Sequence, residues 1–79
     1  MKTILYALRA QAALLKHRSE AKAILAKIER YAETGAGNVT ALVGQPGKRL
    51  RVGDFRALFT EDAATIRVSD IGPRASVYD

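Results

Sequence analysis

The chain has 79 residues, with 13 lysines and arginines against 8 acidic residues and a formal net charge of +5. A chain of this size buries only about 60% of its unfolded surface, so we expect a single domain over residues 1–79 with a modest core. It has no cysteine and one histidine, which excludes disulfides, thiolate metal sites and a zinc site made by histidine alone.

The first predicted elements are a short strand and two helices. Residues 2–6 (KTILY) have the β-branched and aromatic character of a strand. Residues 7–33 are rich in alanine and contain neither glycine nor proline, which predicts helix. Ser19 is expected to cap a second helix, with Glu20 in its first turn and Gly35 just beyond its end.

The apolar residues of both helices are spaced to form one face each. They are expected to be Leu8, Ala12 and Leu15 in the first helix, and Leu25, Ile28, Tyr31 and Ala32, flanked by Ile24 and Ala21, in the second. The pair should form an antiparallel hairpin, and its apolar faces need another layer to cover them.

Residues 34–47 (TGAGNVTALVGQPG) hold four of the six glycines and predict a connection, attached to the core by Val39, Leu42 and Val43. From residue 48 onward the pattern alternates with period two, which is typical of strands. Gly53 and Asp54 predict a two-residue turn between two such runs, and residues 64–71 form a third. Gly72 and Pro73 should end that strand, and residues 76–78 can add a short last one.

This order of elements predicts an α+β fold. An N-terminal strand is followed by an antiparallel two-helix hairpin, which should pack on one face of a three- to four-stranded antiparallel sheet.

The alternation predicts a basic outer face on this sheet. Leu50, Val52, Phe55, Ala57 and Phe59 should face the core, which places Arg49 and Arg51 on the other side, where Arg56 can join them. Arg74 and Tyr78 could reach the same surface. Arginine forks bind phosphate in a bidentate manner and a phenol can stack on a base, so the group suits a polyphosphate chain. The charge pattern alone is equally compatible with a solvated polar face.

Three motifs in order resemble one family. The segments NVTALVG, GKRLRVGDFRALF and IGPRASVY are similar to NVKxLKG, YRLRVGDYRVIF and IGxRxxVY of the RelE/ParE superfamily of toxins from type II toxin–antitoxin systems, and more closely to its RelE-like ribonuclease branch. The alanine- and lysine-rich region after MKTILY also agrees, so the resemblance covers essentially the whole chain.

The resemblance implies an endoribonuclease that inhibits translation by cutting messenger RNA, typically in the ribosomal A site, without a metal or another cofactor. Matched position by position, it implies that Arg56, Arg74 and Tyr78 are catalytic, and that Arg49 and Arg51 bind the RNA. Lys48 stands where the family usually has an aromatic residue, and we expect it to bind the RNA beside them. Arginines stay protonated in proteins and cannot act as ordinary bases, so we expect these residues to bind phosphate and to stabilise its negative charge.

The resemblance also implies partners. They are a cognate antitoxin with an acidic or amphipathic segment, messenger RNA and the ribosome, and operator DNA only through the antitoxin. Two alternatives stay open, a ParE-like inhibitor of DNA gyrase and an antitoxin-binding module that acts in operon autoregulation. No apolar run approaches the roughly 20 residues that span a bilayer, and no secretory signal is recognisable, so we expect a cytoplasmic protein with no membrane partner. His17 is expected to lie exposed at the end of the first helix.

Overall fold

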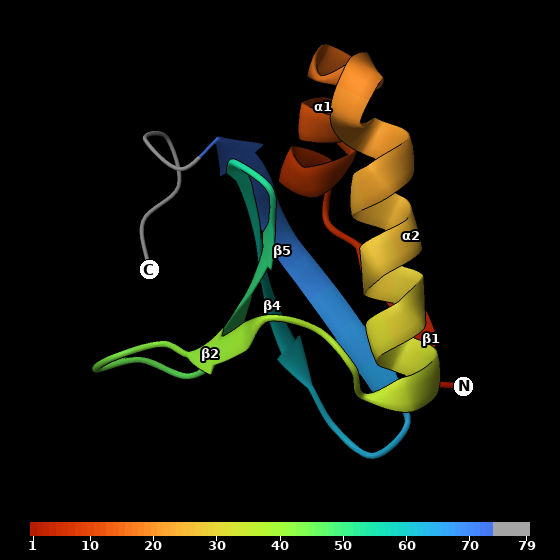
Figure 1. Cartoon of the computed structure of the whole chain (residues 1–79). Coiled ribbons are helices and arrows are strands. Elements are labelled where there is room, and N and C mark those ends of the chain that lie inside the picture. Colours follow the sequence, from red (N-terminus) through yellow and green to blue (C-terminus); the bar gives the residue numbers. More distant parts are fainter. Residues whose placement is uncertain (74–79) are drawn as a thin grey trace.

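The computed structural model describes residues 1–73, which form two helices and five strands. In chain order these are β1 (Thr3–Tyr6), α1 (Leu8–Lys16), α2 (Arg18–Thr34), β2 (Val39–Ala41), β3 (Lys48–Val52), β4 (Phe55–Glu61) and β5 (Thr65–Pro73). Both helices lie on the same face of the sheet (Figure 1). The predicted α+β class, with a helical hairpin packed on a sheet, is confirmed.

The sheet has five strands in the order β1-β5-β4-β3-β2. The strands from β2 to β5 pair antiparallel, whereas β1 pairs parallel with β5, with Ile4 opposite Ile66. The sheet is therefore mixed, and it is wider than the predicted three or four antiparallel strands. The additional strand is β2, which forms within the glycine-rich connection when residues 39–41 pair with β3.

The two helices are divided at His17, and the prediction that Ser19 caps α2 is wrong. His17 leaves the helical conformation at φ −111° and ψ 57°, and no side chain caps α2. The His17 amide still donates to the Ala13 carbonyl, and its own carbonyl accepts from the Ala21 amide, so both helices use this residue. Gly35 ends α2 as predicted, with φ +76° and its amide bonded to the Tyr31 carbonyl.

The apolar face predicted for α1 is the wrong one. Leu8 and Leu15 are 82% and 67% exposed, and the buried residue of α1 is Ala10. A methyl side chain lets the helix backbone approach β5 closely, so the helix turns its smaller residues inward. Leu8 and Leu15 stay on the surface as a consequence.

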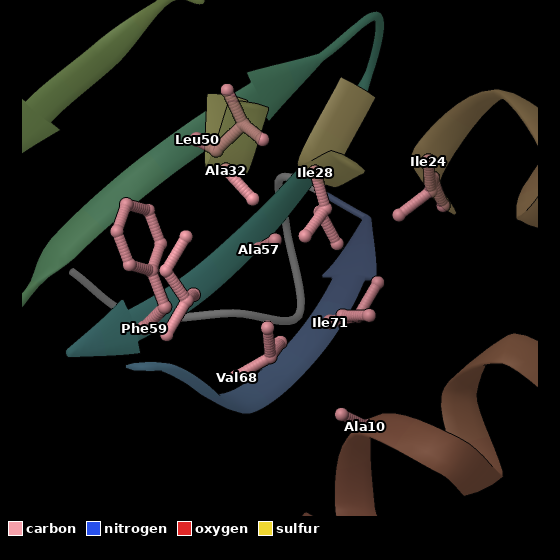
Figure 2. Close-up of a cluster of buried hydrophobic side chains, with 10 residues drawn as sticks. Ala10, Ile24, Ile28, Ala32, Leu50, Ala57, Phe59, Val68 and Ile71 are labelled. Carbon is pink, nitrogen blue, oxygen red and sulfur yellow. The ribbon is translucent and has the colours of Figure 1, made fainter. Parts of the chain in front are cut away.

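The core lies between the two helices and the inner face of the sheet (Figure 2). Its buried members are Ala10, Ile24, Ile28, Ala32, Leu50, Ala57, Phe59, Ile66, Val68 and Ile71. The members from β3 and β4 are the ones that the alternation predicted. This confirms which sides of these strands face inward, and it fixes the direction of every residue between them.

Two details of the loops and strand ends correct the sequence analysis. Val43 is 92% exposed and does not attach the connection to the core, although Val39 packs there. The strand β5 does not stop at Gly72 but continues to Pro73, which pairs with Phe55. β1 ends at Tyr6, opposite Val68, so Pro73 needs no donor toward that side of the sheet. The predicted turn at Gly53 is confirmed, with φ +58°.

Within residues 1–73, neither helix is both long and apolar enough to cross a bilayer.

Candidate nucleic-acid interface

Three arginines of β3 and β4 lie on the face of the sheet that points away from the helices. Arg49 and Arg51 alternate with Leu50 along β3, and Leu50 is only 1% exposed, so the two arginines point outward. Arg56 does the same on β4, because its neighbour Ala57 is buried. We call Arg49, Arg51 and Arg56 the arginine face.

The pairing of β3 with β4 brings two of these guanidinium groups together. Arg51 lies directly opposite Arg56, and Arg49 lies opposite Leu58. Facing side chains in an antiparallel pair have Cβ atoms about 4.5–5.5 Å apart, so two permanent positive charges share a small area. Like charges in this arrangement repel each other, so negatively charged groups are favoured near the pair.

The surroundings of Arg56 differ from those of Arg51. Arg51 is exposed, whereas Arg56 is partly buried, with its Nε atom inaccessible to solvent. The residue opposite Arg56 on β5 is Gly72, which has no side chain to compete for the space beside the guanidinium. Near the turn between β3 and β4, the arginine face therefore contains one partly buried guanidinium, that of Arg56, and one exposed guanidinium, that of Arg51.

Lys48 is separated from the arginine face. It is on the same side of β3 as Leu50, and the residue opposite it on β4 is the buried Phe59. Its ammonium group donates to Oε2 of Glu61 over 2.8 Å. The lysine that the sequence groups with the arginines thus points toward the helices, although its side chain remains 42% exposed.

Glu61 collects three donors from distant parts of the chain. Besides Lys48, it accepts hydrogen bonds from the Lys2 ammonium on Oε1 and from the Tyr31 hydroxyl on Oε2, each at 2.5 Å. The carboxylate side chain is only 14% exposed. We call Lys2, Tyr31, Lys48 and Glu61 the Glu61 cluster, and it joins the N-terminus, α2, β3 and β4.

The pKa values of this cluster follow from the contacts. Burial favours the neutral form of Glu61, but the hydrogen bonds from Lys2, Lys48 and Tyr31 outweigh it and lower its pKa to about 2. Burial and the bond to Glu61 raise the pKa of Tyr31. The bond to the same carboxylate raises the pKa of Lys48. The Lys48 ammonium and the Glu61 carboxylate therefore both stay charged at neutral pH.

The sequence analysis missed this cluster. Its one local signal is that Glu61 lies two residues after the buried Phe59, which places it on the inner side of β4. Its partner Lys2 is 59 residues away along the chain, and nothing in the sequence pairs the two.

Two predicted catalytic residues, Arg74 and Tyr78, lie outside the described residues, and so does the predicted last strand at residues 76–78. The outer-face residue Arg67 is ion-paired to Asp62 over 3.1 Å at the turn before β5. Among residues 1–73, no group of three or more His, Cys, Asp or Glu side chains is placed to hold a metal ion.

Solved structures with the same fold are toxins of toxin–antitoxin systems. The E. coli DinJ–YafQ toxin–antitoxin complex matches with a TM-score of 0.79 at 10% identity, over 99% of this chain and 98% of that chain. The RelB–RelE antitoxin–toxin complex from Methanococcus jannaschii matches with a TM-score of 0.73 at 24% identity, over 95% of each chain. The YoeB dimer from Staphylococcus aureus matches with a TM-score of 0.73 at 16% identity, over 87% of this chain and 92% of that chain.

No protein-family model and no curated protein sequence matches the chain. The structural matches show that this chain has the RelE-like toxin fold, and at the level of the fold they confirm the family resemblance inferred from the sequence.

Proposed function

We propose that this protein is the toxin of a type II toxin–antitoxin system and inhibits translation by cutting messenger RNA. The observation that carries the proposal is the cross-strand pair of Arg51 and Arg56 on the outer face of a RelE-like sheet. Fold alone does not define a function. Here the fold and a charge arrangement suited to a phosphodiester lead to the same reaction class.

The proposed reaction needs no group beyond the chain and the RNA. The ribose 2′-oxygen attacks the adjacent phosphorus while its proton is removed, and the bond to the 5′-oxygen breaks as that oxygen is protonated. The products are a 2′,3′-cyclic phosphate and a free 5′-hydroxyl. Negative charge grows on the phosphoryl oxygens in the transition state, and positioned guanidinium groups stabilise it.

The residues divide between binding and chemistry. Arg49 and Arg51 would hold the backbone beside the cut, and Arg56 would contact the scissile phosphate. The resemblance adds Arg74 at that phosphate and Tyr78 as the group that stacks on a base or moves the proton. Lys48 is left out of this assignment, because its ammonium group is held by Glu61 on the inner side of the sheet.

The antitoxin is the second proposed partner. Two of the structures that share the fold are complexes of a toxin with its antitoxin, DinJ–YafQ and RelB–RelE. We propose that a cognate antitoxin with an acidic or amphipathic segment neutralises this protein, and that operator DNA is reached only through it. The net charge of +5 favours such an acidic partner.

The test is to induce the protein in a bacterial host and map the 5′ ends of messenger RNA. We expect growth arrest with new ends bearing 5′-hydroxyls, concentrated in translated regions if the ribosome presents the substrate. Arg56→Ala should abolish both effects, while Arg30→Ala, an exposed arginine of α2, should leave them intact. Arrested cells with intact transcripts and a DNA-damage response would replace this proposal by gyrase inhibition.

A further inference from the structure

A pocket of about 240 Å³ lies between α1 and residues 70–73 of β5. Its helix side is lined by Arg9, Ala13, Lys16 and His17, and its strand side by Asp70, Ile71, Gly72 and Pro73. β1 ends at Tyr6, opposite Val68, so among residues 1–73 no strand pairs with this edge of β5 beyond Val68.

The lining of the pocket is basic. Arg9 and Lys16 supply two basic side chains, and the only carboxylate that lines the pocket within residues 1–73 is Asp70. Asp70 is ion-paired with the Arg9 guanidinium over 3.3 Å, and its other oxygen accepts a hydrogen bond from the amide of Ile71. A guanidinium group has five N–H donors, so Arg9 is oriented by this contact and keeps donors for a ligand. Its side chain is 80% exposed.

His17 is held at the rim of the pocket by its ring and its backbone. The imidazole packs against Phe55 in a T-shaped contact with 4.9 Å between the ring centres. Its amide is bonded to Ala13, and its carbonyl accepts from Glu20 and Ala21. The ring is thus positioned by packing, and its N–H can serve as a donor to a ligand.

This pocket adjoins the arginine face through two neighbouring strands. Phe55, which holds His17, directly precedes Arg56. Gly72, which lines the pocket, is the pairing partner of Arg56, and neighbouring strands lie about 4.8 Å apart. A nucleic-acid strand with one phosphate at Arg56 would pass over the edge of β5, where Arg9 and Lys16 lie.

We propose that this pocket binds the phosphate of a nucleotide next to the scissile phosphate, with Arg9 and Lys16 as phosphate ligands and the His17 ring as a hydrogen-bond donor. The inference rests on the proposed function, because it extends the same RNA-binding site. It adds contacts from α1 that the three sequence motifs do not contain. This path suits a single-stranded substrate, since an unpaired strand can bend around the edge of a sheet.

The test uses a fluorescent 2′-O-methyl RNA of eight nucleotides, which lacks the attacking hydroxyl and cannot be cut. We expect Arg9→Ala and Lys16→Ala each to weaken binding about fivefold and to reduce the slope of log affinity against log salt by about 0.7. The matched controls are Arg30→Ala and Lys27→Ala, which remove the same charges from exposed positions of α2 outside the pocket. They should bind like the wild type.

A second readout follows the imidazole directly. His17 is the one histidine of the chain, so the untagged protein gives a single set of imidazole signals in a proton–carbon NMR spectrum. These signals should shift when the RNA is added to the wild type. The shift should shrink in Lys16→Ala at the same RNA concentration and remain in Lys27→Ala.

The outcomes separate this inference from the proposed function. If wild-type protein binds RNA and Arg51→Ala weakens binding, but the pocket variants match their controls, the pocket proposal is overturned and the proposed function stands. Absence of RNA binding by the wild type would overturn both. If Arg9→Ala and Lys16→Ala weakened binding of octaglutamate but not of RNA, the pocket would belong to an acidic protein segment instead.

Discussion

The two ends of the β3–β4 hairpin place positive charge on opposite sides of the sheet. At the open end, Lys48 meets a carboxylate that also binds Lys2, and the charges compensate one another on the inner side of the sheet. At the turn end, Arg51 and Arg56 lie opposite each other on the outer side. Within the single strand from Lys48 to Val52, Lys48 thus belongs to the Glu61 cluster, and Arg49 and Arg51 belong to the arginine face. Because successive side chains of a strand point to opposite faces of the sheet, the stabilising residue and the candidate binding residues lie on different sides.

The largest effect expected is on activity at the turn end. Arg56→Ala should lower the rate of RNA cleavage by about 100-fold, because removing one positioned donor from a transition state costs on that order. The measurement is the initial rate of cleavage on translating ribosomes and on naked RNA, with and without a chelator. Arg67→Ala, on the same outer face but paired with Asp62, is the control. Equal losses in both variants would mean that general charge, and not position, matters.

The second-largest effect expected is a loss of protein stability when the Glu61 cluster, at the open end of the β3–β4 hairpin, is disrupted. Glu61→Gln should lower the free energy of unfolding by about 2 kcal/mol, because it leaves the ammonium groups of Lys2 and Lys48 near each other without their shared carboxylate. Urea denaturation at fixed ionic strength measures this. Glu33→Gln, at an exposed position of α2, should change stability by less than about 0.5 kcal/mol. A Glu61→Gln variant as stable as the wild type would contradict the importance of the cluster.

The same carboxylate predicts a pH dependence. The pKa of Glu61 is lowered to about 2 in the folded protein, from an ordinary value of 4.5. Its stabilising contribution is therefore complete above pH 4.5 and is lost as the pH falls from 4.5 toward 2. Urea denaturation of the wild type and of Glu61→Gln at a series of pH values should show their stabilities converging in this window. A constant difference down to pH 2 would argue against the assignment.

The smallest effect expected has the opposite sign. Arg51→Thr should raise the free energy of unfolding by a few tenths of a kcal/mol, because it removes a like-charge pair that faces across two strands and introduces a residue favoured in sheets. Added phosphate should stabilise the wild type more than the variant, and thermal melts with and without phosphate measure this. A variant less stable than the wild type would show that the pair is not repulsive in the folded protein.

The local sequence pattern correctly predicted some of these features and failed to predict others. Period two on β3 and β4 correctly assigned Leu50 and Ala57 to the core, and with them the outward direction of the arginines. The helix α1 was misjudged because Leu8 and Leu15 look like a core face, whereas close packing on β5 selected the small Ala10. The hydrophobicity of a residue does not by itself determine the packing distance between its helix and the neighbouring strand.

Contacts between distant segments were beyond the reach of the sequence pattern. Pairing of β1 with β5 and the bond between Lys2 and Glu61 both join the start of the chain to its last third. The strand β2, within the glycine-rich connection, was not predicted either. It is only three residues long and depends on β3 for its hydrogen bonds. The arginine face was predictable because it is a property of neighbouring residues. The Glu61 cluster was not, because it is a property of the folded chain.

The most direct test of the central claim is NMR of the arginine side chains during titration with uncleavable 2′-O-methyl RNA. The account predicts that the Nε–H signals of Arg51 and Arg56 shift together at low RNA concentration, while the signal of Arg67, which is ion-paired to Asp62, stays in place. If Arg67 shifted and the cross-strand pair did not, the arginine face would not be the site that binds RNA.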